Sequence, residues 1–429
     1  MTTKRTVQLL KNYFWHLPKS IFFNLYYRFP SRKLTIIGVT GTDGKTTTCH
    51  LLHQVLQNAG LNAKVISTIT SPGLHTTSPD SGEIQKILRN YVDSGVTHVV
   101  LEVTAHAIDQ FRFFGCQFAI GLLTNTSHEH LDDFLTLDSY IKTKAKLLKL
   151  SKIAITNIDD PSCPIVSSLI NSQLLTYGYG KSATYRISGV SLTSNTLSFA
   201  INNIIFLTNS AYEYQAYNIT AAFAVIDKLH LDHHLFRKAI KLFPEVTGRR
   251  QEVDNNLGIK TIIDFGHTPK ALTDTLMTLK KRTSGRLIVI FGATGGRDQT
   301  KRPLMGKTVS EHADIAIITA DDTRHEKIDY INSQIIKGFD PTRSIDLSKQ
   351  QSSLPRLKSD KFIYYNIPNR QDAFNLAIKI SRPGDTVVAF GKGHETTILH
   401  GSTEFPWSES QAFRTAFNFK KNANAQTTI

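Results

Sequence analysis

Residues 38–47 read GVTGTDGKTT, directly after a strand-like run at 34–40 and before a helical pattern that begins at about residue 46. A glycine-rich turn between a buried strand and a helix is typical of a phosphate-binding loop, whose backbone N–H groups hold phosphate oxygens. Lys45 would reach the β- and γ-phosphates, and the Thr46 hydroxyl could ligate Mg²⁺. The spacing is GxxGxxGKT rather than GxxxxGK(S/T), because Val39 holds the first glycine position.

Strand-like and helical stretches alternate outward from this loop, which predicts an α/β fold with mostly parallel sheets and helices on both faces. Residues 174–210 are instead polar and short-stranded, and they predict a small antiparallel appendage. The expected helices are residues 46–59, 84–94, 139–150 and 214–230. The expected strands are residues 63–68, 96–103, 118–124, 151–157, 260–264, 286–291, 315–319, 361–365 and 386–390.

The pattern also predicts four segments along the chain, with a hinge at the sequence PEVTGRR (residues 244–250). At roughly 100–200 residues per domain, 429 residues fit two or three domains. The segments are a basic aromatic N-terminal stretch (1–33), a central P-loop ATPase-like domain with a mostly parallel sheet (34–244), a Rossmann-like α/β C-terminal domain (245–420) and a disordered tail (421–429).

Composition excludes several classes of protein. No run approaches the ~20 apolar residues of a membrane span. Cys49, Cys116 and Cys163 are too far apart for a disulfide framework or a CxxC metal site, so we expect a cytoplasmic protein. The net charge of +15 suits anionic substrates such as nucleotides. Because no basic run continues through the body of the chain, we expect no nucleic-acid partner.

Nearly half of the excess positive charge lies in residues 1–33, which hold seven basic residues, eight aromatic residues and no acidic residue. This segment could be a helix packed on the core, a reduced substrate-binding cap, a partner-docking arm or a helix at a membrane surface. Pro18 and Pro30 argue against the membrane helix, because they are expected to interrupt it.

Polar residues fall at the ends of several expected strands, where ligands bind in open α/β sheets. Glu102 is placed for a Mg²⁺ contact, although a carboxylate there could also simply face water. His128 and His130 lack a third zinc ligand at a suitable spacing, and an isolated histidine is more often structural. At least two of three lysines on one expected helix should be solvated: Lys142, Lys144 and Lys146.

Four polar or glycine-rich loops follow expected strands of the second domain. Because the carboxyl ends of parallel strands meet at one edge of a sheet, these loops predict a single functional edge. They read DFGHTP (264–269), FGATGGRDQTKRP (291–303), ADDTR (320–324) and GKGHE (391–395).

Together these motifs resemble the Mur ligase family, ATP-dependent amide ligases of peptidoglycan precursor synthesis, and most of all its MurE-type branch of UDP-N-acetylmuramyl-tripeptide synthetases. The resemblance covers roughly residues 34–415. Besides the segments above, it is carried by HTTSPD (75–80), EVTAHAID (102–109), TNTSHEHLD (124–132), YIKTKAKLL (140–148) and TGRRQEV (247–253).

The resemblance implies that ATP phosphorylates a substrate carboxylate and that an amine then attacks the acyl phosphate, releasing ADP and phosphate. It implies that Lys45, Glu102, His130 and Lys144 are catalytic. It also implies Mg²⁺ ligation by Thr46, Glu102, His130 and Lys144, with Lys144 carbamylated and so anionic. The implied ATP contacts are Gly41, Thr42, Asp43, Gly44, Lys45, Thr46, Thr47, Asn218, Arg249, Asp264 and His267.

The resemblance further implies two small-molecule substrates, a muramyl-dipeptide nucleotide and an amino acid. The family motif that selects diaminopimelate reads Asp-Asn-Pro-Arg, and residues 321–324 read Asp-Asp-Thr-Arg. Because the retained Arg324 can clamp a distal carboxylate, diaminopimelate is expected rather than lysine. The implied acceptor contacts are Thr76, Thr77, Thr104 and Arg112, and the implied amino-acid contacts are Arg302, Asp322, Arg324, Gly391 and Glu395.

One departure from the family leaves alternatives open. Family members carry an N-terminal domain that holds the uridine nucleotide, whereas 33 residues precede the ATPase core here. The chain could therefore be another ADP-forming Mur or folylpolyglutamate-type ligase with a non-UDP acceptor. It could also be an ATP-regulated binding protein at a membrane surface. A monomer is expected.

Overall fold

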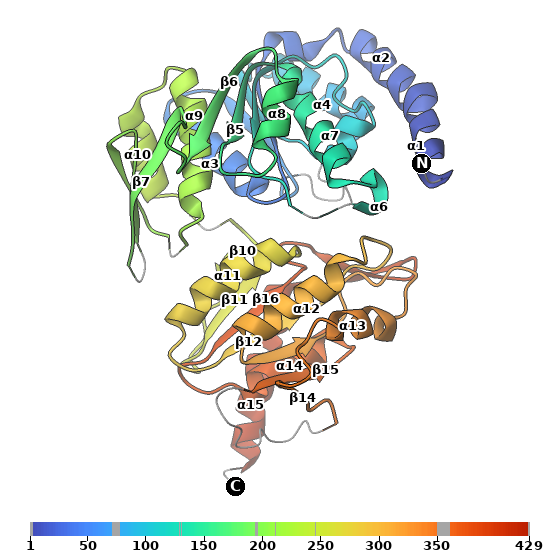
Figure 1. The fold of residues 1–429 in the computed structure, drawn as a ribbon, viewed down its shortest axis with the longest axis vertical. Helices are drawn as coiled ribbons and strands as arrows, with labels where there is room; N and C mark the ends of the chain where they lie inside the picture. Colours follow the sequence, from blue (N-terminus) through green and yellow to red (C-terminus); the bar gives the residue numbers. More distant parts are fainter. Residues whose placement is uncertain are drawn as a thin grey trace. The chain divides into compact units, whose positions relative to one another are not determined.

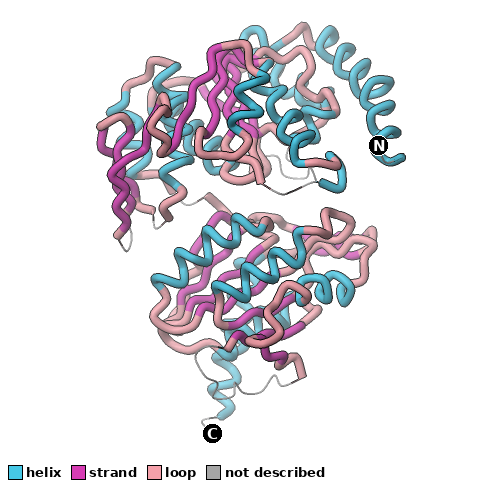
Figure 2. The backbone as a smooth tube through the Cα atoms, in the orientation of Figure 1, coloured by secondary structure: helices cyan, strands magenta, loops and turns pink. Residues whose placement is uncertain are grey.

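The computed structural model describes residues 3–70, 78–127, 129, 131–193, 196–210, 212–244, 246–349 and 361–427. The chain divides into two compact units, one up to Pro244 and one from Glu245. Each unit has a largely parallel sheet with helices on both faces, which confirms the predicted α/β class (Figures 1 and 2). No helix in the described part of the chain is long and apolar enough to cross a membrane.

Among the described residues, the sheet of the first unit has nine strands in the order β2-β3-β1-β4-β5-β6-β7-β8-β9. Neighbours from β2 to β7 are parallel, and β7, β8 and β9 are antiparallel. The strands are β1 (Thr35–Thr40), β2 (Ala63–Ile66), β3 (His98–Glu102), β4 (Phe118–Leu123), β5 (Ser151–Asn157), β6 (Gln173–Gly178), β7 (Tyr185–Leu192), β8 (Leu197–Ile201) and β9 (Ile204–Thr208).

The antiparallel appendage expected at 174–210 is therefore wrong in part. Strand β6 continues the parallel sheet, because it pairs with β5 from Ile153↔Gln173 to Asn157↔Tyr177. Only β7, β8 and β9 form the antiparallel extension.

Helices cover both faces of this sheet, and each face has its own apolar core. The helices of the first core are α3 (Lys45–Asn58), α9 (Gln215–Lys228) and α10 (His233–Lys241). Those of the second are α4 (Ser81–Asp93), α5 (Ala105–Asp109), α7 (Leu137–Lys149) and α8 (Cys163–Leu169). The other helical segments are α1 (Thr3–Lys11), η1 (Asn12–His16), α2 (Leu17–Tyr26), η2 (Pro30–Lys33) and α6 (Leu131–Phe134).

The second unit is built on a sheet whose described strands run in the order β10-β11-β16-β12-β13-β15-β14, parallel except for β10. The strands are β10 (Arg249–Glu252), β11 (Lys260–Asp264), β12 (Leu287–Phe291), β13 (Ile315–Ile318), β14 (Ser344–Asp346), β15 (Phe362–Asn366), β16 (Thr386–Phe390) and the hairpin β17 (Thr397–His400) with β18 (Thr403–Pro406). The helices are α11 (Pro269–Arg282), α12 (Lys301–His312), α13 (Ile328–Ile336), α14 (Arg370–Ile380) and α15 (Glu409–Thr427).

In the described structure, α15 continues to Thr427, into residues 421–429 that were expected to form a disordered tail. Its sequence has no glycine or proline that would end it earlier. The helix is also anchored on α14: Lys420 Nζ donates to the carbonyl oxygens of Ile378 and Ser381, at 2.9 and 2.6 Å.

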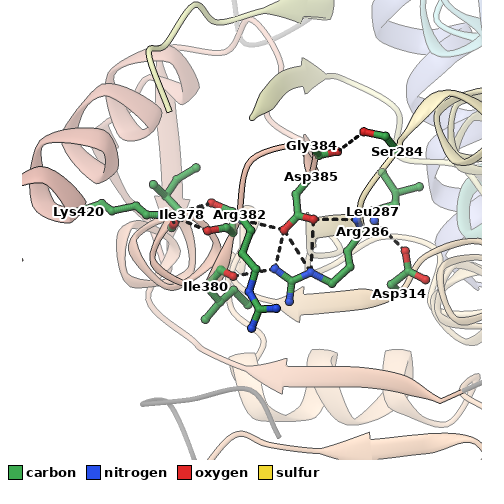
Figure 3. A network of polar contacts seen from close by, with 11 residues as sticks. Ser284, Arg286, Leu287, Asp314, Ile378, Ile380, Arg382, Gly384, Asp385 and Lys420 are labelled. Carbon is green, nitrogen blue, oxygen red and sulfur yellow. Dashed lines mark hydrogen bonds and ion pairs between the residues drawn. The ribbon is translucent and has the colours of Figure 1, made fainter. Parts of the chain in front are cut away.

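The amino-terminal edge of the second sheet is held by the buried carboxylate of Asp385 (Figure 3). It accepts hydrogen bonds from the backbone N–H of Arg286 at 2.8 Å and of Arg382 at 2.9 Å. The Arg286 guanidinium donates to the same carboxylate at 2.5 Å and to the Ile380 carbonyl at 2.8 Å. One side chain thus joins the starts of β12 and β16 to the end of α14.

We predict that Asp385→Asn destabilises the protein by about 2–3 kcal/mol, because an amide of the same size leaves the Arg286 guanidinium without its anionic partner. Urea denaturation of the full chain, followed by circular dichroism, measures this. Asp372→Asn, at an exposed position on α14, is the control and should change stability by less than about 0.5 kcal/mol. Equal effects of the two substitutions would contradict the role of the Asp385 network.

Candidate functional site

The glycine-rich loop joins β1 to α3 and lies against α9. Gly44 has φ +81°, in the left-handed region that favours glycine. A Cβ atom there would lie 2.5 Å from Asn218 Oδ1, so the close approach of α9 also requires glycine. The structure therefore brings Asn218, predicted from the resemblance as an ATP contact, directly to the loop.

The loop is fixed by the residues that follow β4. The Thr42 N–H donates to the Asn125 carbonyl at 2.9 Å, and the Asp43 N–H donates to Asn125 Oδ1 at 3.0 Å. The Thr124 hydroxyl donates to the Asp43 carbonyl at 2.7 Å. These bonds shape the loop before any phosphate binds. Sequence reasoning missed Asn125, although it lies in the quoted TNTSHEHLD segment.

Thr46 and Glu102 meet behind this loop. The Thr46 hydroxyl lies 3.1 Å from each oxygen of the Glu102 carboxylate, and both side chains are buried. The N–H and hydroxyl of Thr68 also donate to Glu102 Oε2, at 3.1 and 3.2 Å. A hydroxyl and a carboxylate held side by side are the hard oxygen ligands that Mg²⁺ prefers, so these two residues fit the predicted metal.

Lys144 on α7 reaches the same loop from the other face of the sheet. Its side chain is 1% exposed, donates to the Gly41 carbonyl and lies 4.3 Å from the centroid of the Tyr140 ring. Burial, together with the charge of Lys45, lowers the pKa of Lys144 well below its ordinary value. This direction shifts Lys144 toward the neutral amine, which is the form that can react with CO₂.

Three predicted site residues, Thr76, Thr77 and His130, lie outside the described residues. Within the described part of the chain, no group of three or more His, Cys, Asp or Glu side chains could hold a metal ion. Of the predicted metal ligands, Thr46 and Glu102 are in direct contact with each other in the described structure.

Thr104 and Arg112, predicted to contact the acceptor, both meet Ser78. The Thr104 hydroxyl lies 3.4 Å from Ser78 Oγ and accepts from the Ala107 N–H at 3.2 Å, so it caps α5. Arg112 donates to the Ser78 carbonyl and, through Nε, to Gln110 at 3.0 Å. Ser78 was missed as a site residue, although it belongs to the quoted HTTSPD segment.

In the second unit, basic and aromatic side chains gather at the end of β11. The Arg249 guanidinium lies 4.0 Å from the centroid of the Phe265 ring, whose own centroid is 5.0 Å from that of His267. Arg250 Nε lies 3.3 Å from Asp264 Oδ2. Arg249, Asp264 and His267 are thus brought together as predicted contacts for ATP, and Phe265 joins them as an unpredicted member. A guanidinium stacked on a ring can still pair with phosphate.

The loops after β13 and β16 share a cluster of buried charges. Lys392 is 2% exposed and lies 2.7 Å from Asp322 Oδ1, and it also pairs with Glu395. Burial disfavours its charge, but the carboxylates of Asp321, Glu395 and Asp322 raise the pKa of Lys392. A Cβ atom on Gly391 would lie 2.5 Å from Asp321 Oδ2, which explains the glycine. Lys392 was missed, although it stands in the GKGHE segment.

Arg324 stands beside this cluster with unused hydrogen-bonding capacity. Its backbone N–H donates to the Leu399 carbonyl at 3.2 Å, which fixes it against the β17 strand. Its Nε is buried and has no hydrogen-bond partner among the described residues. A bound anion would satisfy a buried donor of this kind.

Arg302, also predicted to contact the amino acid, is held inside the second unit by hydrogen bonds. Its side chain is fully buried and donates to Glu326 Oε2 at 2.8 Å and to Gln334 Oε1 at 2.6 Å. Glu326 in turn accepts from the Gly296 N–H at 2.5 Å. The terminal nitrogens of Arg302 thus support the 294–296 loop, while its Nε is buried without a hydrogen-bond partner among the described residues, and its contact with the amino acid stays a prediction.

A buried ion pair holds both strand ends of the cluster. Arg370 Nε donates to Glu409 Oε1 at 2.8 Å. Its two terminal nitrogens donate to the carbonyl oxygens of Ala320 at 2.9 Å and Phe390 at 2.8 Å, next to Asp321 and Gly391. No local motif marked this pair in the sequence.

The comparisons with known proteins agree with this arrangement. The chain matches the Mur ligase middle domain over residues 39–226 and the Mur ligase glutamate ligase domain over residues 248–393. The UDP-N-acetylmuramoyl-L-alanyl-D-glutamate–2,6-diaminopimelate ligase of Geobacter metallireducens is 33% identical over 412 residues, covering 91% of this chain and 80% of its own length. The ligase of the same name from Nostoc is 34% identical over 409 residues, which cover 91% of this chain and 78% of the Nostoc protein.

Solved structures give the same picture. A solved structure of a UDP-N-acetylmuramoyl-L-alanyl-D-glutamate–2,6-diaminopimelate ligase is 27% identical in sequence. It has a TM-score of 0.58, and the match covers 90% of this chain and 79% of that chain. The folylpolyglutamate synthase of Mycobacterium tuberculosis has a TM-score of 0.69, and the match covers 96% of this chain and 99% of that chain. Because the two sequences are only 13% identical, this likeness shows a shared fold alone. With both domains matched in order and relatives above 30% identity over nine-tenths of its length, this chain belongs to the Mur ligase family of ATP-dependent, ADP-forming ligases.

Proposed function

We propose that the protein joins meso-diaminopimelate to UDP-N-acetylmuramoyl-L-alanyl-D-glutamate with hydrolysis of ATP to ADP, in peptidoglycan precursor synthesis. The observation that carries the ligase chemistry is the buried Lys144 amine against Gly41 of the phosphate loop, beside the Thr46–Glu102 pair. The names of the relatives supply the substrates. The three free, buried cysteines support a reducing cytoplasm as its place of action. We also propose a monomer.

The first chemical step is phosphorylation of the acceptor. Lys45 and the loop hold the phosphates of ATP while an acceptor carboxylate oxygen attacks the γ-phosphorus, and ADP leaves as an acyl phosphate forms. Thr46 and Glu102, with His130, would hold Mg²⁺, which neutralises phosphate charge when bound. We propose that Lys144 adds CO₂ with loss of a proton, so that its carbamate supplies a further anionic ligand. Asn218, Arg249, Asp264 and His267 complete the proposed ATP contacts.

The second step forms the amide bond. The amine of the amino acid attacks the acyl carbon, a tetrahedral intermediate forms, and phosphate leaves. Thr76, Thr77, Thr104 and Arg112 are the proposed contacts of the acceptor. Asp322, Gly391 and Glu395 are proposed to receive the amino-acid end that reacts, and Arg324 its distal carboxylate. The unpartnered Nε of Arg324 supports this assignment.

The function itself predicts a substrate requirement. ADP release should need both the acceptor nucleotide and diaminopimelate, because the acyl phosphate is consumed only when an amine attacks it. A coupled assay for ADP measures this across a panel of carboxylate and amine substrates. Release with a folate acceptor instead, or with no amine at all, would refute the proposal.

For Lys144, we predict that Lys144→Ala lowers turnover by about 10²–10³-fold, because an anionic group beside the phosphates is lost. Short carboxylic acids should restore part of the activity by supplying that anion. Carbon NMR with labelled bicarbonate should show a carbamate in the unsubstituted protein and none in the variant.

The matched control for Lys144 is Lys142→Ala on the same helix. Lys142 is 56% exposed and pairs with Asp138 at 2.7 Å, so its loss should leave turnover within about twofold of normal. Near-normal turnover of Lys144→Ala without added acid would show that no carbamate is required.

For Arg324, we predict that Arg324→Ala weakens the use of diaminopimelate by about 30-fold or more, the effect of losing one partner of a desolvated charge pair. Use of lysine should change little, because lysine has no distal carboxylate. Steady-state kcat/KM for each amino acid measures the difference. Arg237→Ala, exposed on α10, is the control. An equal loss for both amino acids would mean that Arg324 only supports the loop.

A further inference from the structure

Residues 3–26 form one continuous rod, α1, η1 and α2, which lies along the first unit (Figure 1). The interruption expected at Pro18 is absent. Proline has no N–H, and the turn before it is π-helical: the Leu17 N–H donates to the Asn12 carbonyl, five residues back. This turn absorbs the proline without ending the helix.

The inward face of the rod is polar at its amino-terminal half. Arg5 forms a two-bond ion pair with Asp109 at the end of α5, at 2.7 and 2.8 Å. Asn12, which is buried, donates to the same carboxylate at 2.9 Å. Burial disfavours the charged form of Asp109, but the Arg5 guanidinium holds its pKa below the ordinary value. This end of the rod is therefore fastened by charge.

The carboxy-terminal half is also fastened by buried polar groups. Ser20 Oγ donates to the Phe111 carbonyl at 2.7 Å, and Asn24 Nδ2 donates to the Phe114 carbonyl at 2.6 Å. Both side chains are at most 1% exposed. The segment they contact carries Arg112, a proposed acceptor contact. The rod is thus held in one orientation on the acceptor side of the first unit.

The outward face of the rod is apolar, the reverse of an ordinary surface helix. Its side chains recur at helical spacing and are between 41% and 78% exposed. Aromatic rings make up much of this surface, and Phe14 is the most exposed of them. The outward residues, called here the apolar stripe, are Val7, Leu10, Tyr13, Phe14, Trp15, Ile21, Phe22, Leu25 and Tyr26.

Basic residues border the apolar stripe. Lys11, Arg28, Arg32 and Lys33 are exposed, and residues 1–33 include no acidic residue. A second copy of the chain would bring two positive surfaces together, which like charges disfavour. An anionic lipid surface offers opposite charge, an apolar layer for the aliphatic residues and an interfacial zone for Trp and Tyr.

We propose that the apolar stripe and its basic border dock the enzyme on an anionic membrane surface, with the rod lying in the plane of the interface. The polar inward face stays attached to the first unit, so docking requires no rearrangement of the fold. The proposal goes beyond the ligase activity and stands independently of it. It places the proposed acceptor contacts Thr104 and Arg112 on the side of the unit that faces the lipid.

The experiment is sedimentation of the full-length protein with vesicles of mixed phosphatidylcholine and phosphatidylglycerol, against vesicles of phosphatidylcholine alone. The protein should bind the anionic vesicles and only weakly the neutral ones. Phe14→Ser combined with Phe22→Ser should weaken binding tenfold or more, on the order of the loss expected for two buried aromatic side chains. Lys11→Gln with Arg28→Gln should weaken it about fivefold for each charge removed.

Matched controls separate the rod from general hydrophobicity and charge. Ile205→Ser with Leu207→Ser removes two exposed apolar side chains from β9, which are 66% and 45% exposed. Lys152→Gln with Lys181→Gln removes two exposed positive charges elsewhere on the first unit. Both control pairs should bind vesicles like the unsubstituted protein, and all variants should keep its unfolding midpoint because the changed side chains are exposed.

Insertion depth gives a second readout. Brominated lipids should quench the fluorescence of Trp15, and Trp15→Phe should remove that quenching while vesicles are still bound. Absence of binding to anionic vesicles, or binding lost equally in the control pairs, would overturn the proposal. So would a dimer in solution that Phe14→Ser with Phe22→Ser converts to a monomer, since the stripe would then bind a second copy. Ligase activity on soluble substrates is measured in parallel and should be the same in every variant.

Discussion

Parallel pairing of β1 with β3 on one side and β4 on the other is the constraint on which the first unit depends. Val39 lies opposite Glu102, and Thr40 lies opposite Leu123. Because the three strands point the same way, the loop after β1, the carboxylate of β3 and the amide of Asn125 after β4 meet at one edge. The parallel pairing therefore brings together residues that are distant in the sequence: Thr46 contacts Glu102, 56 positions away, and Asp43 contacts Asn125, 82 positions away.

Buried lysines show how the same side chain serves two purposes in this protein. Lys392 faces three carboxylates, which outweigh burial and keep its ammonium charged. Lys144 faces a carbonyl oxygen and an aromatic ring, with Lys45 nearby, and burial prevails. The first lysine pairs with carboxylates of its own and the neighbouring loop, whereas burial shifts the second toward its neutral form. The difference lies in the partners, since both side chains are almost fully buried.

The amino-terminal rod follows a different rule from the other helices. A surface helix ordinarily buries its apolar face, and α3, α4 and α7 do so. The rod buries Asn12, Ser20 and Asn24 and exposes most of its apolar residues, although Phe23 packs on Gly82 and the Tyr13 ring contacts Phe111. Hydrogen bonds and an ion pair attach the rod to the first unit. Because these polar contacts hold it in place, most of its apolar surface stays exposed. That surface stays available for another phase or partner.

The sequence by itself determined what depends on local pattern. The strands β5, β11 and β16 begin and end where apolar runs and turn residues predicted. GVTGTDGKTT predicted the phosphate loop, and the family followed from this segment together with the other motifs. Only the tertiary structure decided contacts between distant residues. The ion pair of the buried Arg302 with Glu326 is one such contact, because the two residues lie 24 positions apart in different segments. The Arg370–Glu409 pair left no local trace, because it joins the start of α14 to that of α15. Composition showed that residues 1–33 combine aromatic and basic residues. Which face turns inward depended on contacts with distant residues, such as that of Arg5 with Asp109, 104 positions away.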